Sequence, residues 1–190
     1  MPRNLEKVRV RLQAAAMELF RSRGYDTVTA AEIARRAGVT ERTFFRHFAD
    51  KREALFGGEA ALLLVLTNAV RDAPEALGMW ATLFRAFQSA ESLLIENRHF
   101  AQTRRHIIAG NPPLQEREAG KATILAAGLA EALGRRGHSN RQTILAAHVG
   151  TAAFAQAFEL WLQDESKPYN QCLEDAFQEV KALTTSKLVE

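Results

Sequence analysis

The stretch TAAEIARRAGVTERTFFRHF, residues 29–48, decides the fold of this 190-residue chain. Thr29 and Glu32 have the spacing of a capping box, which predicts that a short helix begins here. Gly38 ends that helix, because glycine permits a sharp reversal that a Cβ atom would hinder. Thr40 then caps a second short helix that runs to about residue 48. Two short helices joined by such a tight turn form a helix-turn-helix.

The sequence on both sides of this stretch has helical period, and we find no alternating pattern typical of a strand. Before it, apolar residues recur every three or four positions over residues 4–23. After it, six helices are predicted, over residues 51–71, 75–96, 98–109, 113–135, 140–164 and 169–187. We therefore expect an all-α fold. A three-helix head, residues 1–50, is joined by a long helix beginning at Lys51 to a larger helical bundle, residues 51–190.

Charge is unevenly distributed along the chain. Residues 1–52 contain 12 Lys or Arg and 6 Asp or Glu, a net charge of +6, whereas the remainder contains 13 and 16, a net of −3. A basic first quarter on a mildly acidic body is the pattern of a nucleic-acid-binding head.

Composition argues against several other classes of protein. The single cysteine, Cys172, excludes an internal disulfide framework and a thiolate zinc cluster. No apolar run approaches the ~20 residues that cross a bilayer, and the N-terminus lacks a signal-peptide core. The catalytic motifs HExxH, GxSxG and the P-loop are absent, and His99 and His106 lack a third ligand. We expect a cytoplasmic protein that is not an enzyme, contacts no membrane, and needs no cofactor or metal.

Several linked motifs then resemble the tetracycline-repressor-like (TetR) family. They are AAMELF (15–20), GY (24–25), TVT (27–29), EIA (32–34), AGVT (37–40), TFFRHF (43–48) and KREAL (51–55). The resemblance implies a one-component transcriptional regulator, usually a repressor. It further implies a homodimer on a palindromic operator, with a small-molecule effector in the C-terminal domain that changes the separation of the two heads.

The polar residues of the second short helix and its surroundings are the expected DNA contacts. Phe44 and Phe48, four positions apart, should face inward. Arg42 suits a guanine edge, although a phosphate contact is the alternative. Phe45 replaces a tyrosine that is frequent in the family, so it either packs or contacts a thymine methyl group. The candidates are Thr29, Thr40, Glu41, Arg42, Thr43, Phe45, Arg46, His47 and Lys51.

Large apolar and polar residues of the C-terminal part are the candidates for effector binding. They are Trp80, Phe84, Phe87, Phe100, Arg104, Ile107, Leu125, His148, Phe154 and Phe158, with His99 and His106 as further polar groups. A pocket of this kind favours a largely hydrophobic effector. Ordinary core packing explains the aromatic spacing equally well.

Two hypotheses concern the architecture of the body. Residues 140–164 and 169–187 carry broad apolar faces, with small residues such as Ala147, Ala152 and Ala155, that serve either a dimer interface or packing within one subunit. Gly57 and Gly58, placed inside the predicted long helix, act either as a hinge or to relieve crowding against the first helix. As an alternative function, an architectural DNA-binding protein would need no effector.

Overall fold

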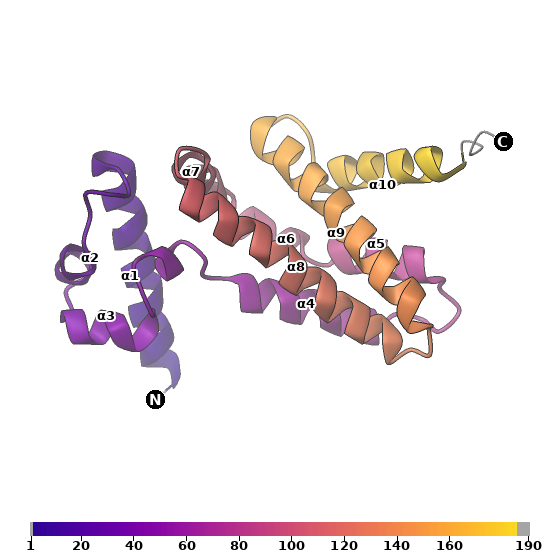
Figure 1. Ribbon diagram of the computed structural model, residues 1–190, viewed down its shortest axis with the longest axis horizontal. Coiled ribbons are helices and arrows are strands. Elements are labelled where there is room, and N and C mark those ends of the chain that lie inside the picture. The colour runs from indigo at the N-terminus through magenta and orange to yellow at the C-terminus, as the bar shows by residue number, and fades with distance from the viewer. Residues whose placement is uncertain (1, 186–190) are drawn as a thin grey trace. The chain divides into compact units, whose positions relative to one another are not determined.

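The computed structural model describes the backbone of residues 2–185 and the side chains of residues 5–183 and 185. Figure 1 shows the order of the elements. The α-helices are α1 (Pro2–Arg23), α2 (Ala30–Arg36), α3 (Glu41–His47), α4 (Glu59–Arg71), α5 (Met79–Gln88), α6 (Glu91–Glu96), α7 (Arg98–Ala109), α8 (Pro112–Gly134), α9 (Asn140–Gln163) and α10 (Tyr169–Thr185), and one 3-10 turn, η1 (Arg52–Ala54), precedes α4. No strand occurs among the described residues, which confirms the all-α prediction.

The chain forms two compact units that do not coincide with the predicted domains. Unit 1 contains the residues up to Glu59 together with His99–Glu116, and unit 2 contains Ala60–Arg98 and the residues from Arg117 onward. The expected boundary at residue 50 therefore lies inside unit 1, and α7 belongs to the same unit as the helix-turn-helix. No helix within residues 2–185 is long and apolar enough to cross a membrane.

Unit 1 is built around one hydrophobic core. In Figure 1, α2 and α3 lie on one side of α1. Leu12 and Phe20 of α1, Ile33 of α2 and Phe44 of α3 are almost completely buried in a common cluster. Ile108 of α7 joins that cluster, because the apolar face of α7 packs against residues between 12 and 56. Burial of large side chains at about 25 cal/mol per Å² makes this cluster the main stabilising term of the unit.

The predicted long helix from Lys51 to residue 71 is interrupted. After η1 the chain leaves the helical path, and α4 begins only at Glu59. Gly58 has a φ of +95°, a left-handed conformation that cannot continue an α-helix. A Cβ atom on Gly57 would lie 1.5 Å from Nε2 of Gln13 on α1, so the chain passes close to that side chain here. This contact favours relief of crowding over a hinge within a helix.

The predicted helix over residues 75–96 is also divided, into α5 and α6. The Ser89 hydroxyl donates to the carbonyl of Ala86 at 2.6 Å, a local bond that competes with continuation of the helix. The predicted helices over 98–109, 113–135 and 140–164 agree with α7, α8 and α9 to within one residue. The predicted end of the last helix at residue 187 lies outside the described residues.

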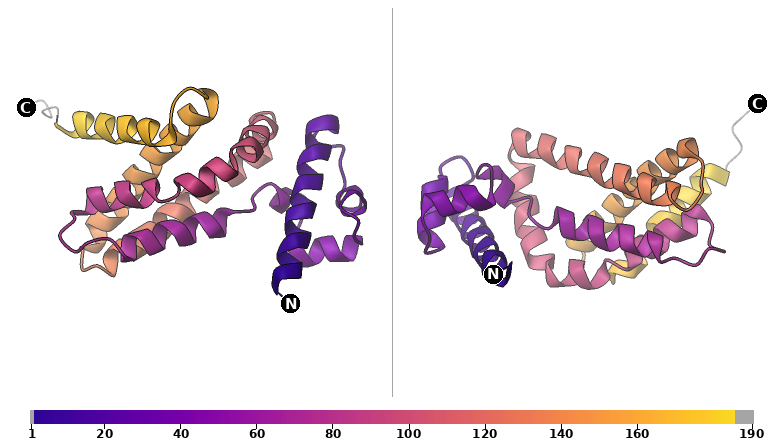
Figure 2. Two further views of the ribbon diagram at one scale, coloured as in Figure 1. Left: turned by 180° about the vertical axis from the view of Figure 1, so that it is seen from behind. Right: turned by 90° about the horizontal axis from the view of Figure 1, so that it is seen from below.

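Unit 2 has a second core in which α5, α9 and α10 pack together (Figures 1 and 2). Small residues on α9 permit this, because a Cβ atom on Gly150 would already lie 3.2 Å from Leu83 of α5. The buried Tyr169 hydroxyl of α10 donates to the carbonyl of Phe87 at 2.9 Å. Of the small residues that were predicted for either a dimer face or internal packing, Ala147 is buried within the subunit, whereas Ala152 and Ala155 are exposed.

Candidate DNA-binding surface and effector groove

The N-terminus of α2 is held by the predicted capping box. The amide of Glu32 donates to Oγ1 of Thr29 at 3.2 Å, and the amide of Thr29 donates to the Glu32 carboxylate at 2.9 Å. Arg23 of α1 donates to the same carboxylate at 2.7 Å. These hydrogen bonds lower the pKa of Glu32 from 4.5 to about 2. The largest effect comes from the backbone amide of Thr29, followed by Arg23 and then the Thr29 hydroxyl.

We expect the capping box to be lost in acid. The folded state holds Glu32 ionised, so its contribution to stability is complete above pH 4.5 and disappears as the pH falls toward 2. A Glu32→Gln variant should therefore melt at a lower temperature than the parent chain at pH 7, and this difference should shrink at pH 3. Thermal unfolding followed by circular dichroism at both pH values measures it. A difference that is the same at both pH values would contradict the assignment.

The turn between α2 and α3 sets the direction of α3. Gly38 has a φ of +69°, which glycine adopts without steric cost, and its amide donates to the Arg35 carbonyl at 3.1 Å. The amide of Val39 donates to the carbonyl of Ala34 at 3.0 Å, so the turn closes on the end of α2. Thr40 then caps α3 by accepting from the amide of Thr43 at 3.2 Å.

The side chains of α3 divide into a buried and an exposed face. Phe44 and Phe48 are buried in the core of unit 1, as predicted. Arg42, Phe45 and Arg46 are exposed, and half of the Phe45 surface (51%) is accessible to solvent. Of the remaining candidates on this surface, Thr29, Thr40 and Glu41 are exposed. Thr43 and His47 are half-buried. The exposed ring of Phe45 favours a contact outside the protein over internal packing.

The C-terminus of α3 is fixed by an arginine that the sequence analysis missed. Arg9 of α1 donates to the carbonyl of His47 at 3.3 Å, and its guanidinium lies 4.8 Å from the centre of the Phe48 ring. Burial, and then the charges of Arg46 and Arg9, lower the pKa of His47 below its usual 6.5. The neutral form of His47 is therefore favoured at pH 7. Only the tertiary structure brings Arg9 and His47 together, since 38 positions separate them.

Lys51 has a structural role in this structure, and its predicted phosphate contact stays a prediction. Its ammonium donates to the carbonyls of Tyr25 at 2.8 Å, Val28 at 3.0 Å and Asp26 at 3.3 Å, and it lies 4.3 Å from the centre of the Tyr25 ring. These three acceptors use all three donors of the ammonium. The side chain thereby ties η1 to the loop that precedes α2.

Lys51→Met should remove these bonds while keeping the aliphatic length of the side chain. We expect the free energy of unfolding of unit 1 to fall by about 1–3 kcal/mol, because the part-buried carbonyls of Tyr25 and Val28 and the exposed carbonyl of Asp26 lose a charged donor. Urea denaturation followed by circular dichroism measures this, with the exposed Lys7→Met on α1 as the control. If Lys51→Met loses DNA affinity while its stability is unchanged, Lys51 contacts a DNA phosphate.

The aromatic candidates for effector binding in unit 2 form a core cluster. The Phe87 and Phe154 rings stack with their centres 4.8 Å apart. Trp80 and Phe84 pack against Phe177 of α10, at 4.5 and 5.2 Å. Of the other candidates in this unit, Leu125 is buried on α8, Phe158 packs between Phe154 and Trp161, and His148 is exposed on α9. In this structure these rings pack as a core, which was the alternative interpretation, and their part in effector binding stays a prediction.

Three further candidates, Phe100, Arg104 and Ile107, belong to unit 1. Phe100 and Ile107 pack against the core that contains the helix-turn-helix. Arg104 donates through Nε to the carbonyl of Leu55 at 2.7 Å, and its guanidinium lies 4.7 Å from the centre of the Phe56 ring. Arg104 therefore holds α7 against the segment after η1, and its role as an effector anchor stays a prediction.

The structure instead shows a groove between α4 and α8 that sequence reasoning missed. Its volume is about 1140 Å³. It is lined by Ala60, Leu63, Leu64, Thr67, Asn68, Arg71, Asp72, Ala73 and Glu75 on one side, and by Gly128, Glu131, Ala132, Arg135, Arg136 and His138 on the other. The absence of a side chain on Gly128 lets Leu63 of α4 pack closely against α8, since a Cβ atom there would lie 2.6 Å from Leu63.

The groove is apolar at one end and charged at the other. Leu63 and Gly128 meet at the apolar end. At the other end, Arg136 donates to the carbonyls of Val70, Ala73 and Pro74 at 2.7–3.2 Å and so caps α4. Arg71–Asp72 and Arg135–Glu131 are ion pairs at this end, and both are largely exposed to solvent. Exposed pairs contribute little to stability, so their arginines remain able to exchange partners for an anionic group.

Comparison with known proteins places this geometry in a family. The family model of bacterial regulatory proteins of the tetR family matches residues 12–56, and a model of the MftR C-terminal domain matches residues 77–184. The chain belongs to the TetR family. It is thus similar to transcriptional regulators, and no enzyme activity follows from this membership.

Individual relatives of this TetR-family chain agree with the family models. A protein of Mycobacterium tuberculosis named as the mycofactocin biosynthesis transcriptional regulator MftR is 30% identical over 178 residues, which cover 88% of this chain and 86% of that protein. The regulator TcmR of Streptomyces glaucescens is 47% identical over 51 residues, 27% of this chain and 23% of its own length. The structure of the Thermus thermophilus repressor FadR with lauroyl-CoA has a TM-score of 0.59 and 25% identity, and 96% of each chain is covered.

Proposed function

We propose that this TetR-family regulator is a homodimeric repressor whose α3 helices read a palindromic operator. The exposed row of Arg42, Phe45 and Arg46 on α3, anchored by buried Phe44, is the observation that carries the proposal. Arginine donates two parallel bonds to guanine, and an apolar ring fits a thymine methyl group, so this face suits the major groove. The neighbouring polar residues Thr29, Thr40, Glu41, Thr43 and His47 suit contacts that position the helix on the phosphates.

The dimer forms through the outward stripe of α9 in this proposal. Leu145, His148, Ala152 and Ala155 are exposed at helical spacing, and two thirds of the surface of Leu145 (67%) is accessible. This stripe lies opposite the residues that pack inside unit 2. Small side chains there permit close approach of the same helix from a second copy.

Ala152→Arg tests the dimer, because it places a long charged side chain in the middle of the α9 stripe. Light scattering coupled to gel filtration should show a dimer for the parent chain and a monomer for the variant. Ala127→Arg, at an exposed position of α8, is the control and should remain dimeric. A parent chain that is monomeric at all concentrations would contradict the proposal.

The effector occupies the groove between α4 and α8, and it is a fatty acyl group linked to an anionic head. The groove, with a volume of about 1140 Å³, Leu63 and Gly128 at one end and arginines at the other, suits such a molecule. The similarity to FadR, whose structure contains lauroyl-CoA, supports the same class of effector. Binding releases DNA to the extent that the effector prefers the conformation with low DNA affinity.

The experiment begins with selection of an operator from a random duplex library at fixed salt concentration. The selected sites should be palindromic, with half-sites about one helical turn apart. Lauroyl-CoA should then weaken binding to the best site by roughly 5- to 150-fold, whereas coenzyme A alone should not. Salt-sensitive binding without an enriched sequence would favour the architectural alternative.

The location of the effector is tested with two matched glycine variants of α8. Gly128→Met should fill the apolar end of the groove and abolish the response to lauroyl-CoA. Gly120→Met changes a position with no atom within 4 Å and should respond like the parent chain. Melting temperatures of both variants show that they fold. A full response of Gly128→Met would place the effector elsewhere.

A further inference from the structure

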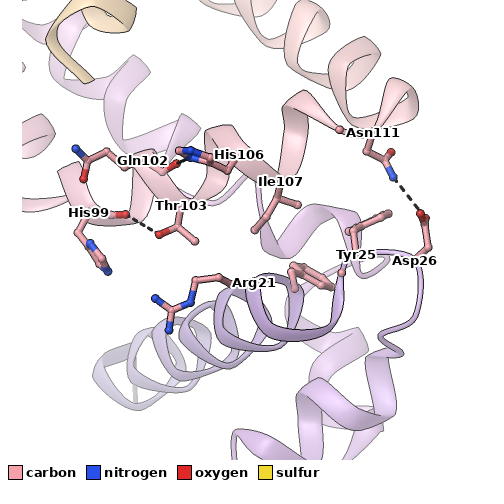
Figure 3. A pocket seen from close by; sticks show the side chains of 12 residues that line it. Arg21, Tyr25, Asp26, His99, Gln102, Thr103, His106, Ile107 and Asn111 are labelled. Carbon is pink, nitrogen blue, oxygen red and sulfur yellow. Dashed lines mark hydrogen bonds between the residues drawn. The ribbon is translucent and has the colours of Figure 1, made fainter. Parts of the chain in front are cut away.

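A second cavity lies within unit 1, separate from both the DNA-binding face and the groove of unit 2. Its volume is about 620 Å³, within the range of small-molecule sites. We name it the α1–α7 pocket after the helices that supply most of its lining. Its residues are Phe20, Arg21, Gly24, Tyr25, Asp26, His99, Gln102, Thr103, His106, Ile107, Gly110 and Asn111. Figure 3 shows their arrangement.

One end of the α1–α7 pocket is basic. Figure 3 shows the guanidinium of Arg21 on α1 and the ring of His99 on α7 at the same end. Among residues 2–185, neither side-chain group makes a hydrogen bond or ion pair in this structure. The acidic residue one turn before Arg21 is Glu18, and its carboxylate is bound by Arg36 through two bonds of 3.0 and 2.8 Å. The N–H groups of the Arg21 guanidinium can therefore donate to an anion.

The middle of the pocket is apolar and rigid. The rings of Phe20 and Tyr25 are in contact, with centres 5.1 Å apart, and Phe20 is almost fully buried. Lys51 holds Tyr25 from outside the pocket through its cation–π contact. Ile107 of α7 is half-buried and supplies a second apolar surface. A flat or aliphatic body can lie on these side chains without rearrangement of the core.

At the opposite end of the pocket, a carboxylate accepts a hydrogen bond from a side-chain amide. The side-chain amide of Asn111 donates to Oδ1 of Asp26 at 3.4 Å, and Asn111 is itself buried. Figure 3 places this pair away from Arg21 and His99. The acid therefore does not oppose a negative charge at the basic end.

We propose that the α1–α7 pocket binds a small organic anion, with its carboxylate between Arg21 and His99 and its apolar body on Tyr25 and Ile107. An arginine that donates to a carboxylate forms a charge-assisted, directional bond, and this bond selects an acid over its amide. The body of the ligand is limited to a small molecule by the pocket volume. The site is distinct from the proposed effector groove, because every residue that lines it belongs to unit 1.

Occupation of the pocket links α1 to α7. Arg104 and the Asp26–Asn111 bond already connect α7 and its C-terminal end to the N-terminal residues of unit 1. An anion that contacts both helices adds to these links, so it stabilises unit 1 by mass action. The regulator would thereby respond to a second small molecule, which binds outside the groove of unit 2.

Benzoate is the probe, since it combines one carboxylate with a flat apolar body, and benzamide is its neutral counterpart. Titration of the full chain by calorimetry should show saturable binding of benzoate and none of benzamide. Amide resonances of residues 20–26 and 99–111 should shift on addition of benzoate, whereas those of α4 and α8 beyond residue 117 should not. No operator DNA is required, so failure here leaves the proposed function intact.

Arg21→Gln should weaken benzoate binding roughly tenfold, because it removes the charged donor. Arg11→Gln, an exposed position of the same helix outside the pocket, should bind benzoate like the parent chain. Equal melting temperatures in the absence of benzoate exclude a folding defect. Unchanged binding in Arg21→Gln, shifts confined to unit 2, or inorganic phosphate binding as tightly as benzoate would each overturn the proposal.

Discussion

Replacement of Phe44 by alanine should lower the free energy of unfolding of unit 1 by about 3–5 kcal/mol. Phe44 is fully buried in the core, where its ring contacts Phe48 at 5.5 Å between centres and Phe45 at 5.4 Å. Removal of a buried ring costs its transfer free energy together with the energy of the cavity left behind. Because Phe44 also anchors α3, DNA binding should fall with the loss of structure.

The neighbouring residue supplies a matched control. Phe45→Ala deletes the same ring at a position where 51% of the surface is exposed, so stability should change by less than about 1 kcal/mol. Urea denaturation measures both variants by two signals. Circular dichroism follows all helices, and tryptophan fluorescence follows unit 2, where Trp80 and Trp161 both lie. Equal losses for the two variants would contradict the assigned orientation of α3.

Arg42→Ala should relax operator selection at one base pair in each half-site. Arg42 is exposed on the first turn of α3, beyond the cap formed by Thr40. A bidentate bond to guanine discriminates against the other bases by about 1–3 kcal/mol, a factor of roughly 5–150. The variant should bind the selected operator more weakly by that factor, and single-base variants of the operator should then bind equally well at that position.

The measurement is a titration of the selected operator and its single-base variants at two salt concentrations. Arg35→Ala on α2, also exposed, is the control and should preserve the selected sequence. If Arg42→Ala weakens all sequences alike and lowers the salt dependence by about one counterion, Arg42 contacts phosphate instead. The two outcomes are distinct, because only base contacts carry sequence information.

In the effector region the sequence pattern does not distinguish a core from a pocket. Aromatic spacing in Trp80, Phe84 and Phe87 is the same for a core and for a pocket, and the structure assigns these rings to the core. The groove of α4 and α8 has little periodic signal, because it is lined by ordinary residues from two distant segments. No pattern within either helix alone identifies it.

The sequence by itself determined the helix-turn-helix. Its decisive interactions are local: the capping box joins Thr29 to Glu32, Thr40 caps α3 three residues on, and the positive φ of Gly38 needs only its own missing side chain. The tertiary structure alone decided the roles of the long cationic side chains. Lys51 reaches a carbonyl 26 positions away and Arg104 one 49 positions away. A flexible charged side chain is compatible with DNA, solvent or a carbonyl, and only the packed chain shows which acceptor lies within reach.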